Sequence, residues 1–221
     1  PMIVFSRLTL GFFYFLPVVL KTGLRAMATN RLPFHFMRVL LSVVAMTCTY
    51  YAYSHLPLAT ATAIGFIGPI MTTMLSILLL KESVSFSHWF FIFLGYIGVL
   101  IIVRPGGLFL EPALLVALGA NFFASASLIA MKELSQTEST VQIMFWSQLL
   151  SVLLLIFFLP LFWKMPTLYE LKWLLLLGFV GVFSQFSYTK ALTYGSPALV
   201  APFEYSRLVF AIPIGLLFFA E

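Results

Sequence analysis

Charged residues are scarce in this chain of 221 residues, and aspartate is absent from it altogether. Only 9% of the residues are charged and 62% are hydrophobic, which gives a mean hydropathy of +1.08. A soluble domain carries about 25% charged residues, so the composition excludes an ordinary soluble protein. The formal net charge of +5 does not indicate a nucleic-acid partner, because basic residues of membrane proteins gather in cytoplasmic loops.

Cysteine and the motifs of catalysis are equally sparse. The single cysteine, Cys48, has no second thiol to pair with, and the three histidines form no metal-ligand pattern. The chain contains no P-loop and no Gly-x-Ser-x-Gly motif. We therefore expect no metal, no cofactor and no enzymatic activity.

Long apolar runs fill the sequence instead. A helix that crosses a bilayer needs about 20 mainly apolar residues, and the runs do not show the strict alternation of membrane strands. Eight spans are predicted, at about 2–20, 37–54, 58–80, 87–103, 110–131, 142–163, 170–190 and 198–219. The predicted fold class is an all-α membrane protein, a polytopic helical bundle with the lipid bilayer as partner. Most basic residues fall on the side of the loop at 21–38, which the positive-inside rule makes cytoplasmic.

A weak internal repeat divides the chain. A shift of 139 residues places residues 52–82 on 191–221 without a gap, with Ala52 on Ala191 and Glu82 on Glu221. The shift carries the third span onto the eighth, so the two copies cross the membrane in opposite directions, as in many secondary transporters. We predict two inverted repeats of five helices, at 1–103 and 110–221, which lack their first and last helix respectively.

Two charged residues stand inside the last apolar span. Between Ser196 and Ala220, only Glu204 and Arg207 carry full charge, and their spacing of three puts them on one helix face. Charges at the centre of a membrane helix cost about 2.5–3.5 kcal/mol each on the insertion scale and usually mark a pathway or a paired contact. Glu204 and Arg207 therefore either line a solute path or neutralise each other between helices.

Helix-breaking residues accompany the charges. Pro202 and Pro213 interrupt the last span, and its counterpart in the first half carries Gly65, Gly68 and Pro69. The shift of 139 residues places Gly65 opposite Glu204 and Gly68 opposite Arg207. Broken helices at matching places in two halves are typical of a transporter binding site.

Five further polar residues are candidates for solute contact. They lie inside predicted spans and are Tyr50, Tyr51, Asn121, Gln185 and Tyr188. The tyrosine rings can stack on a planar or cationic solute. Each of the five can equally well form an interhelical hydrogen bond, and the residues alone leave both roles open.

The segments "LPLATATAIGFIGPIMTTMLSILLLKE", "GYIGVLIIVRPG" and "YGSPALVAPFEYSRLVFAIPIGLLFFAE" resemble the EamA-like transporters of the drug/metabolite transporter superfamily. The resemblance implies a ten-helix, inverted-repeat carrier of amino acids and other small metabolites in the bacterial inner membrane. Within the family, "SPALVAPFEYSRLVF" is most similar to carriers described as S-adenosylmethionine uptake transporters. Such a solute needs a carboxylate, a cation and aromatic faces, and Glu204, Arg207 and the tyrosines supply these types.

The sequence thus predicts a secondary transporter for an amino acid or an S-adenosylmethionine-like zwitterion, working by alternating access. Glu204 either binds a cationic group of the solute or carries a coupling proton. The alternatives are an exporter of other metabolites or drugs in the same superfamily and a membrane assembly protein that transports nothing. The sequence does not address the oligomeric state.

Overall fold

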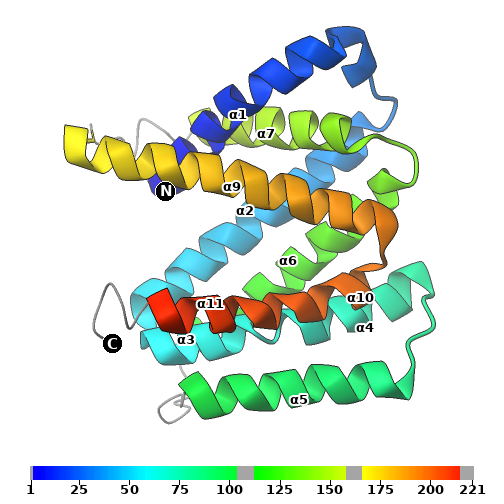
Figure 1. Ribbon diagram of the computed structural model, residues 1–221, viewed down its shortest axis with the longest axis vertical. Helices are drawn as coiled ribbons and strands as arrows, with labels where there is room; N and C mark the ends of the chain where they lie inside the picture. The colour runs from blue at the N-terminus through cyan, green and yellow to red at the C-terminus, as the bar shows by residue number, and fades with distance from the viewer. Residues whose placement is uncertain (1, 104–111, 158–165, 215–221) are drawn as a thin grey trace. The chain divides into compact units, whose positions relative to one another are not determined.

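The computed structural model describes residues 2–103, 112–157 and 166–214, and within these ranges every regular element is a helix. This agrees with the predicted fold class, since only helices and closed barrels satisfy all backbone hydrogen bonds inside a bilayer. Figure 1 labels most of these elements. The helices are α1 (Met2–Thr22), η1 (Leu24–Met27), α2 (Leu32–His55), α3 (Leu58–Gly65), α4 (Gly68–Leu80), α5 (Phe86–Val103), α6 (Pro112–Ser135), α7 (Thr140–Ile156), α9 (Leu168–Tyr194), α10 (Pro197–Val200), η2 (Ala201–Tyr205) and α11 (Ser206–Ile214).

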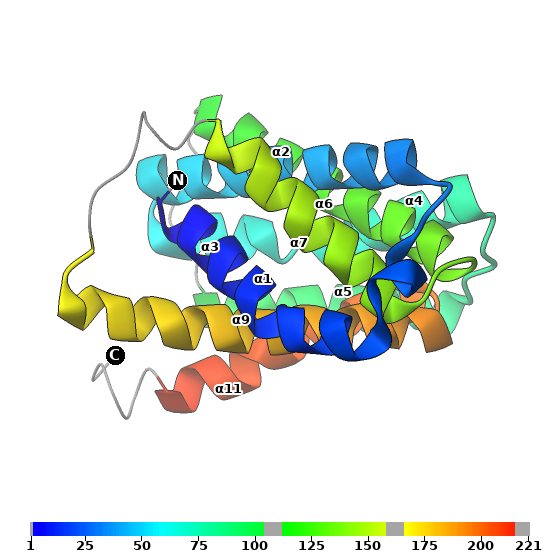
Figure 2. The same cartoon turned by 90° about the horizontal axis from the view of Figure 1, so that it is seen from above.

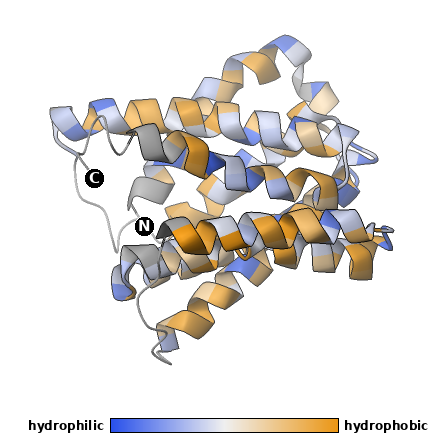
Figure 3. Ribbon diagram, turned by 60° about the horizontal axis from the view of Figure 1, so that its bottom comes forward, coloured by the Kyte–Doolittle hydropathy of each residue, from blue (hydrophilic) through white to orange (hydrophobic). Residues whose placement is uncertain are grey.

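Four stretches of helix are long and apolar enough to cross a membrane, and two shorter apolar helices accompany them. Hydrophobic residues predominate along the helices, and many hydrophilic ones lie in the connections (Figure 3). The four stretches are Leu32–His55, Thr60–Leu80, Pro112–Ser135 and Tyr169–Tyr194, and the shorter two are Phe86–Ile101 and Thr140–Ile156. Parts of the predicted spans at 110–131, 142–163 and 198–219 lie outside the described residues.

Helix boundaries repeat with the same shift of 139 residues as the sequence. α2 ends at His55 and α9 at Tyr194, and the next helix begins at Leu58 in one copy and at Pro197 in the other. The following span is interrupted in both copies. The first copy breaks between α3 and α4, and the second narrows into the 3-10 segment η2 before α11.

The helices pack as two compact units. Unit 1 holds the described residues up to Val43 and those from Ala130 to Tyr194, and unit 2 holds Val44–Ile129 and the described residues from Gly195 onward. α2 and α6 contribute residues to both units. Each unit therefore combines helices of both predicted repeats, and the repeats at 1–103 and 110–221 stay a prediction.

In unit 1, α1, α7 and α9 pack side by side (Figure 1). Glycines let them approach closely, because a methyl group on Gly178 of α9 would lie 2.8 Å from Cβ of Leu10 on α1. Arg7 lies against Gly181 one turn further along α9, with Nε 2.7 Å from the corresponding Cβ position. Small residues at helix contacts are the usual means of close packing in membranes.

Replacing Gly178 by Ala is expected to destabilise unit 1 by about 1–3 kcal/mol, the usual cost of overpacking. The contact is with a Cβ atom rather than a flexible chain end, so the α1 backbone has to shift. Gly98→Ala is the matched control, because it also lies within a helix and meets nothing within 4 Å. Thermal melting in detergent measures both variants, and equal melting temperatures would contradict the close α1–α9 contact.

A polar network joins the two connecting segments of unit 1, the loop after α1 and the loop between α6 and α7 (Figure 2). His35 Nε2 lies 2.5 Å from Glu138 Oε2, and the other carboxylate oxygen accepts a hydrogen bond from Thr29. The His35 side chain is fully buried and that of Glu138 is 6% exposed. Buried charged groups of this kind hold a structure together only when they are paired. The two loops are thus fixed to each other by one carboxylate.

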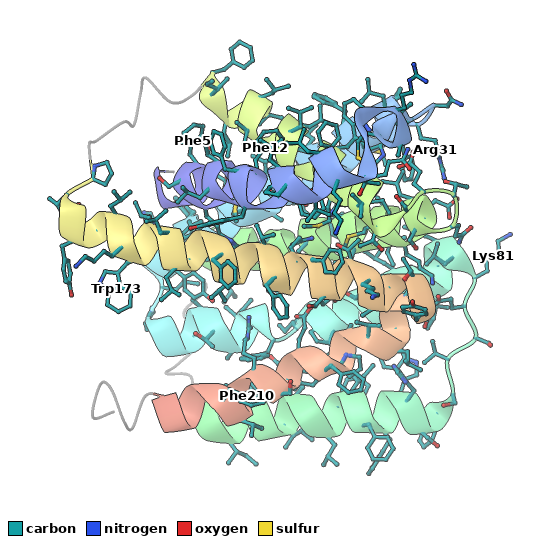
Figure 4. All side chains as sticks on the ribbon, turned by 45° about the horizontal axis from the view of Figure 1, so that its top comes forward. Phe5, Phe12, Arg31, Lys81, Trp173 and Phe210 are labelled. Atoms are coloured by element: carbon teal, nitrogen blue, oxygen red, sulfur yellow. The ribbon has the colours of Figure 1, made fainter. Side chains whose placement is uncertain are left out.

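Arg31 reinforces the same loops from the surface. Its guanidinium donates to Thr137 Oγ1 at 3.0 Å and lies 3.6 Å from the Glu133 carboxylate. Figure 4 shows the Arg31 side chain at this end of the helices. Both members of the Arg31–Glu133 pair are about one-third exposed, and exposed ion pairs contribute only about 0–1 kcal/mol.

In unit 2, small residues allow α2, α3 and α6 to pack closely. The buried residues of this cluster are Ala52, Leu56, Ala61, Ile64, Ala113 and Ala117. α4 ends at Lys81, which takes the left-handed conformation (φ 55°) and donates its N–H to Ser76 O. The Lys81 side chain points away from the helices (Figure 4), as expected for a cap at the membrane surface.

Candidate solute-binding cavity in unit 2

A cavity of about 190 Å³ lies within unit 2, beside both interrupted spans. Five helical elements and the first turn of α11 supply its walls. The lining residues are Thr49, Ala52 and Tyr53 of α2, Ala61 and Gly65 of α3, Gly68 and Thr72 of α4, Ala117, Ala120, Asn121, Ala124, Ser125 and Leu128 of α6, Glu204 of η2, and Arg207 of α11. Alanine and glycine form much of the wall, so their small side chains leave the open volume.

The breaks in the two spans follow from their prolines and glycines. Pro69 stands in the first turn of α4, where its missing N–H costs no helix hydrogen bond. Pro202 occupies the equivalent position in η2, where α10 tightens into a 3-10 turn. Pro213 lies near the end of the described part of α11. The interrupted backbone carries Gly65, Gly68 and Glu204 to the cavity wall.

Asn121 is held in one orientation by the broken helix. Its side-chain nitrogen donates to Ile64 O and to Ala117 O, both at 3.0 Å. The amide oxygen is therefore turned towards Gly68, where it lies 3.3 Å from the position that a Cβ atom would take. Glu204 Oε2 lies 3.8 Å from the same position. Two oxygen atoms from distant parts of the chain thus converge beside Gly68.

Arg207 brings a positive charge to the same cavity. Its guanidinium carbon lies 4.3 Å from the ring centroid of Phe66, the buried residue at the α3–α4 break. A cation over an aromatic face is worth about 0.5–1 kcal/mol at an exposed site. The aromatic ring therefore positions the guanidinium at the break, and the cavity has both a carboxylate and a cation in its wall.

Of the residues singled out in the sequence, Glu204, Arg207, Asn121, Gly65 and Gly68 all line this cavity. Residues 204 and 207 come from the second repeat, and 65 and 68 come from the first. The pairing of charge with glycine at matching places in the two copies therefore corresponds to one cavity wall.

The remaining candidates lie elsewhere. Tyr50 and Tyr51 are 41% and 43% exposed and do not line the cavity, and the Tyr51 ring stacks on His55 with centroids 4.0 Å apart. Gln185 and Tyr188 are on α9 in unit 1 and are not among the lining residues.

Sequence reasoning missed Thr49 and Tyr53, which line the cavity from the same helix as the two predicted tyrosines. The signal that could have found them is helical spacing. Thr49, Ala52 and Tyr53 recur at intervals of three and four, so they share one face with the buried Ala52. Tyr50 and Tyr51 point about 100–200° away from Thr49 around the same helix.

Apolar helices that surround a small polar cavity beside two broken spans define an integral membrane protein of the carrier class. The chain belongs to the EamA-like transporter family, whose model matches residues 1–104 and 111–221. The family assignment confirms the resemblance noted in the sequence. It also confirms that the protein belongs to a family of transporters and not of enzymes.

Characterised relatives differ in solute and in direction. The chain is 30% identical to an S-adenosylmethionine uptake transporter of Rickettsia bellii, over 99% of this chain and 75% of that protein. It is 29% identical to a pseudopaline exporter of Pseudomonas aeruginosa, covering 99% and 78%. A riboflavin transporter of Vibrio cholerae is 30% identical over 92% of this chain and 70% of its own length.

A solved crystal structure shares the fold. Its TM-score is 0.77 at 18% sequence identity, with 97% of this chain and 77% of that chain covered. At this identity the likeness establishes the fold alone.

Proposed function

We propose that this chain is the central part of a secondary transporter that moves a small organic metabolite across the bacterial inner membrane by alternating access. The observation that carries the proposal is the cavity beside the two broken spans, with Glu204, Arg207 and Asn121 in its wall. Ionisable residues within membrane spans are costly and mark solute or ion pathways. The bacterial relatives are transporters, which supports the same activity and membrane.

The proposed solute is a zwitterion, either an amino acid or an S-adenosylmethionine-like molecule. A carboxylate from Glu204 and a guanidinium from Arg207 complement an ammonium and a carboxylate respectively. Drug-sized ligands occupy sites of roughly 300–1,000 Å³, so a cavity of about 190 Å³ suits a head group of amino-acid size. The S-adenosylmethionine uptake transporters among the relatives support a solute with such a head group.

Glu204 has two proposed roles, which share one group. It binds the cationic part of the solute, or it exchanges that cation for a proton and so couples transport to the proton gradient. Tyr50, Tyr51, Gln185 and Tyr188 stay predicted contributors to the solute path.

Counterflow in proteoliposomes tests the proposal. The intact protein is reconstituted, the vesicles are preloaded with S-adenosylmethionine and a pool of amino acids, and labelled S-adenosylmethionine is added outside. We expect accumulation of label above protein-free vesicles. Exchange of a labelled amino acid instead would keep the carrier and discard the S-adenosylmethionine assignment. No exchange of any of these solutes, by protein shown to be folded, would overturn the proposed function.

A further inference from the structure

The neutral polar side chains that line the cavity have used their hydrogen-bond donors within the protein. Thr49 Oγ1 donates to Ala45 O at 2.9 Å, and Thr72 Oγ1 donates to Ser125 Oγ at 2.9 Å. Ser125 Oγ in turn donates to Gly68 O at 3.4 Å. Asn121 has placed both of its N–H groups on backbone carbonyls. A hydroxyl has one proton and an amide nitrogen has two, so these four side chains have only lone pairs left to offer a solute.

The acceptors are concentrated at one point of the wall. Asn121 Oδ1 and Glu204 Oε2 lie 3.3 and 3.8 Å from the Cβ position of Gly68, and the absence of a side chain at Gly68 leaves that position open. Thr72 and Ser125 stand on the same side, since Ser125 bonds to the Gly68 carbonyl. Gly65 also lines the cavity, but nothing lies within 4 Å of its Cβ position. The acceptor-rich corner is therefore specific to Gly68.

This arrangement selects one chemical class of cation. A primary ammonium carries three N–H donors and a positive charge, and it satisfies an amide oxygen and a carboxylate together. A sulfonium or a quaternary ammonium carries the charge without a donor. It would leave the buried amide oxygen of Asn121, a residue only 8% exposed, without a partner.

We infer that the corner beside Gly68, formed by Asn121 Oδ1 and Glu204 Oε2, is the subsite for a primary ammonium group of the solute. The inference rests on the proposed function and narrows it, because solutes that lack an N–H-bearing cation are excluded. The ammonium, and not the sulfonium, is then the group of S-adenosylmethionine that occupies this corner. The Arg207 guanidinium is left to receive the carboxylate.

Competition by related molecules distinguishes the two cations of S-adenosylmethionine. S-adenosylhomocysteine keeps the ammonium and lacks the sulfonium, so we expect it to compete in the counterflow measurement. Methylthioadenosine lacks the amino-acid part and is expected not to compete. If the carried solute is an amino acid, the N-acetylated amino acid replaces methylthioadenosine as the solute expected to fail. Competition by the solute without the ammonium would overturn the inference.

Filling the corner with one methyl group tests its position. Gly68→Ala puts Cβ 3.3 Å from Asn121 Oδ1, and we expect the apparent affinity for the carried solute to fall at least about tenfold, which corresponds to ~1.4 kcal/mol. Gly119→Ala, on α6 and outside the cavity lining, meets nothing within 4 Å and is expected to leave transport unchanged. Unchanged affinity in folded Gly68→Ala would overturn the inference.

A thiol-labelling experiment tests the corner without transport. In a Cys48→Ala background, Gly68→Cys and Gly65→Cys are each reacted with aminoethyl methanethiosulfonate, a primary ammonium, and with the anionic sulfonatoethyl methanethiosulfonate. We expect the cationic-to-anionic rate ratio at position 68 to exceed that at position 65 by about tenfold or more. Ser125→Cys, beside the same corner, is used if Gly68→Cys does not fold.

The labelling separates the inference from the proposed function. A high ratio at position 68 with no solute carried would keep the cation subsite and overturn the transport proposal. Equal ratios, together with normal transport by Gly68→Ala, would overturn the subsite and leave the transport proposal standing.

Discussion

Glu204→Gln is expected to lower the transport rate by about 100-fold while the protein remains folded and extractable. Glutamine keeps the shape of the side chain but removes the negative charge beside Gly68. Hydrogen bonds to charged groups contribute about 1.5–3 kcal/mol, and the upper value corresponds to roughly 100-fold. Initial rates of counterflow, normalised to reconstituted protein, measure the effect. A rate equal to that of the wild-type protein would remove Glu204 from the site.

Glu133→Gln is the matched control for this experiment. It makes the same chemical change in the half-exposed pair with Arg31, away from the cavity lining. We expect its transport rate to be close to that of the wild-type protein, because such pairs contribute about 0–1 kcal/mol. An equal loss in both variants would point to a general effect of reduced charge.

A second variant separates a transporter from a membrane assembly protein. Removing both charges together, as in Glu204→Ala with Arg207→Ala, can be nearly neutral for stability when the pair is only structural. A transporter loses its activity in the double variant even when the melting temperature is preserved. Retention of transport by the double variant would assign the two charges to helix packing.

Glu138→Ala is expected to be the most destabilising single change in the loop network of unit 1, by about 3 kcal/mol. It removes the carboxylate that pairs with the fully buried His35 and accepts a hydrogen bond from Thr29. Nδ1 of His35 has no hydrogen-bond partner among the described residues, so the ring depends on Glu138. Thermal melting in detergent is expected to show a marked fall in melting temperature.

The control for Glu138→Ala is Glu133→Ala, five residues earlier on α6. Both replacements remove a glutamate that faces the loop after α1, but the Glu133 side chain is 37% exposed and that of Glu138 is 6% exposed. We expect a loss of at most about 1 kcal/mol for Glu133→Ala. Similar melting temperatures of the two variants would show that the buried His35–Glu138 contact contributes little to stability.

The sequence by itself determined the class of the protein, the family and the places where helices break. Scarce charge and long apolar runs leave few alternatives to a helical membrane protein. The shift of 139 residues placed helix ends at His55 and Tyr194 in register, because prolines and glycines interrupt helices through local backbone chemistry. Glu204 and Arg207 were identifiable because charge is so costly inside a membrane.

Only the tertiary structure decided which side chains meet. In a soluble helix the polar face reveals the buried side, but lipid and protein interior are both apolar, so α2 gives no such signal. The structure chose Thr49 and Tyr53 for the cavity and left Tyr50 and Tyr51 exposed.

The same limit applies to contacts between distant segments. His35 and Glu138 stand 103 residues apart in the chain, and the convergence of Asn121 and Glu204 beside Gly68 likewise depends on helix packing. Hydrogen bonds also set which atoms a polar residue presents, as Asn121 turns its oxygen to the cavity only because Ile64 O and Ala117 O take its N–H groups. Sequence supplies the residue types, and packing of the helices determines their partners.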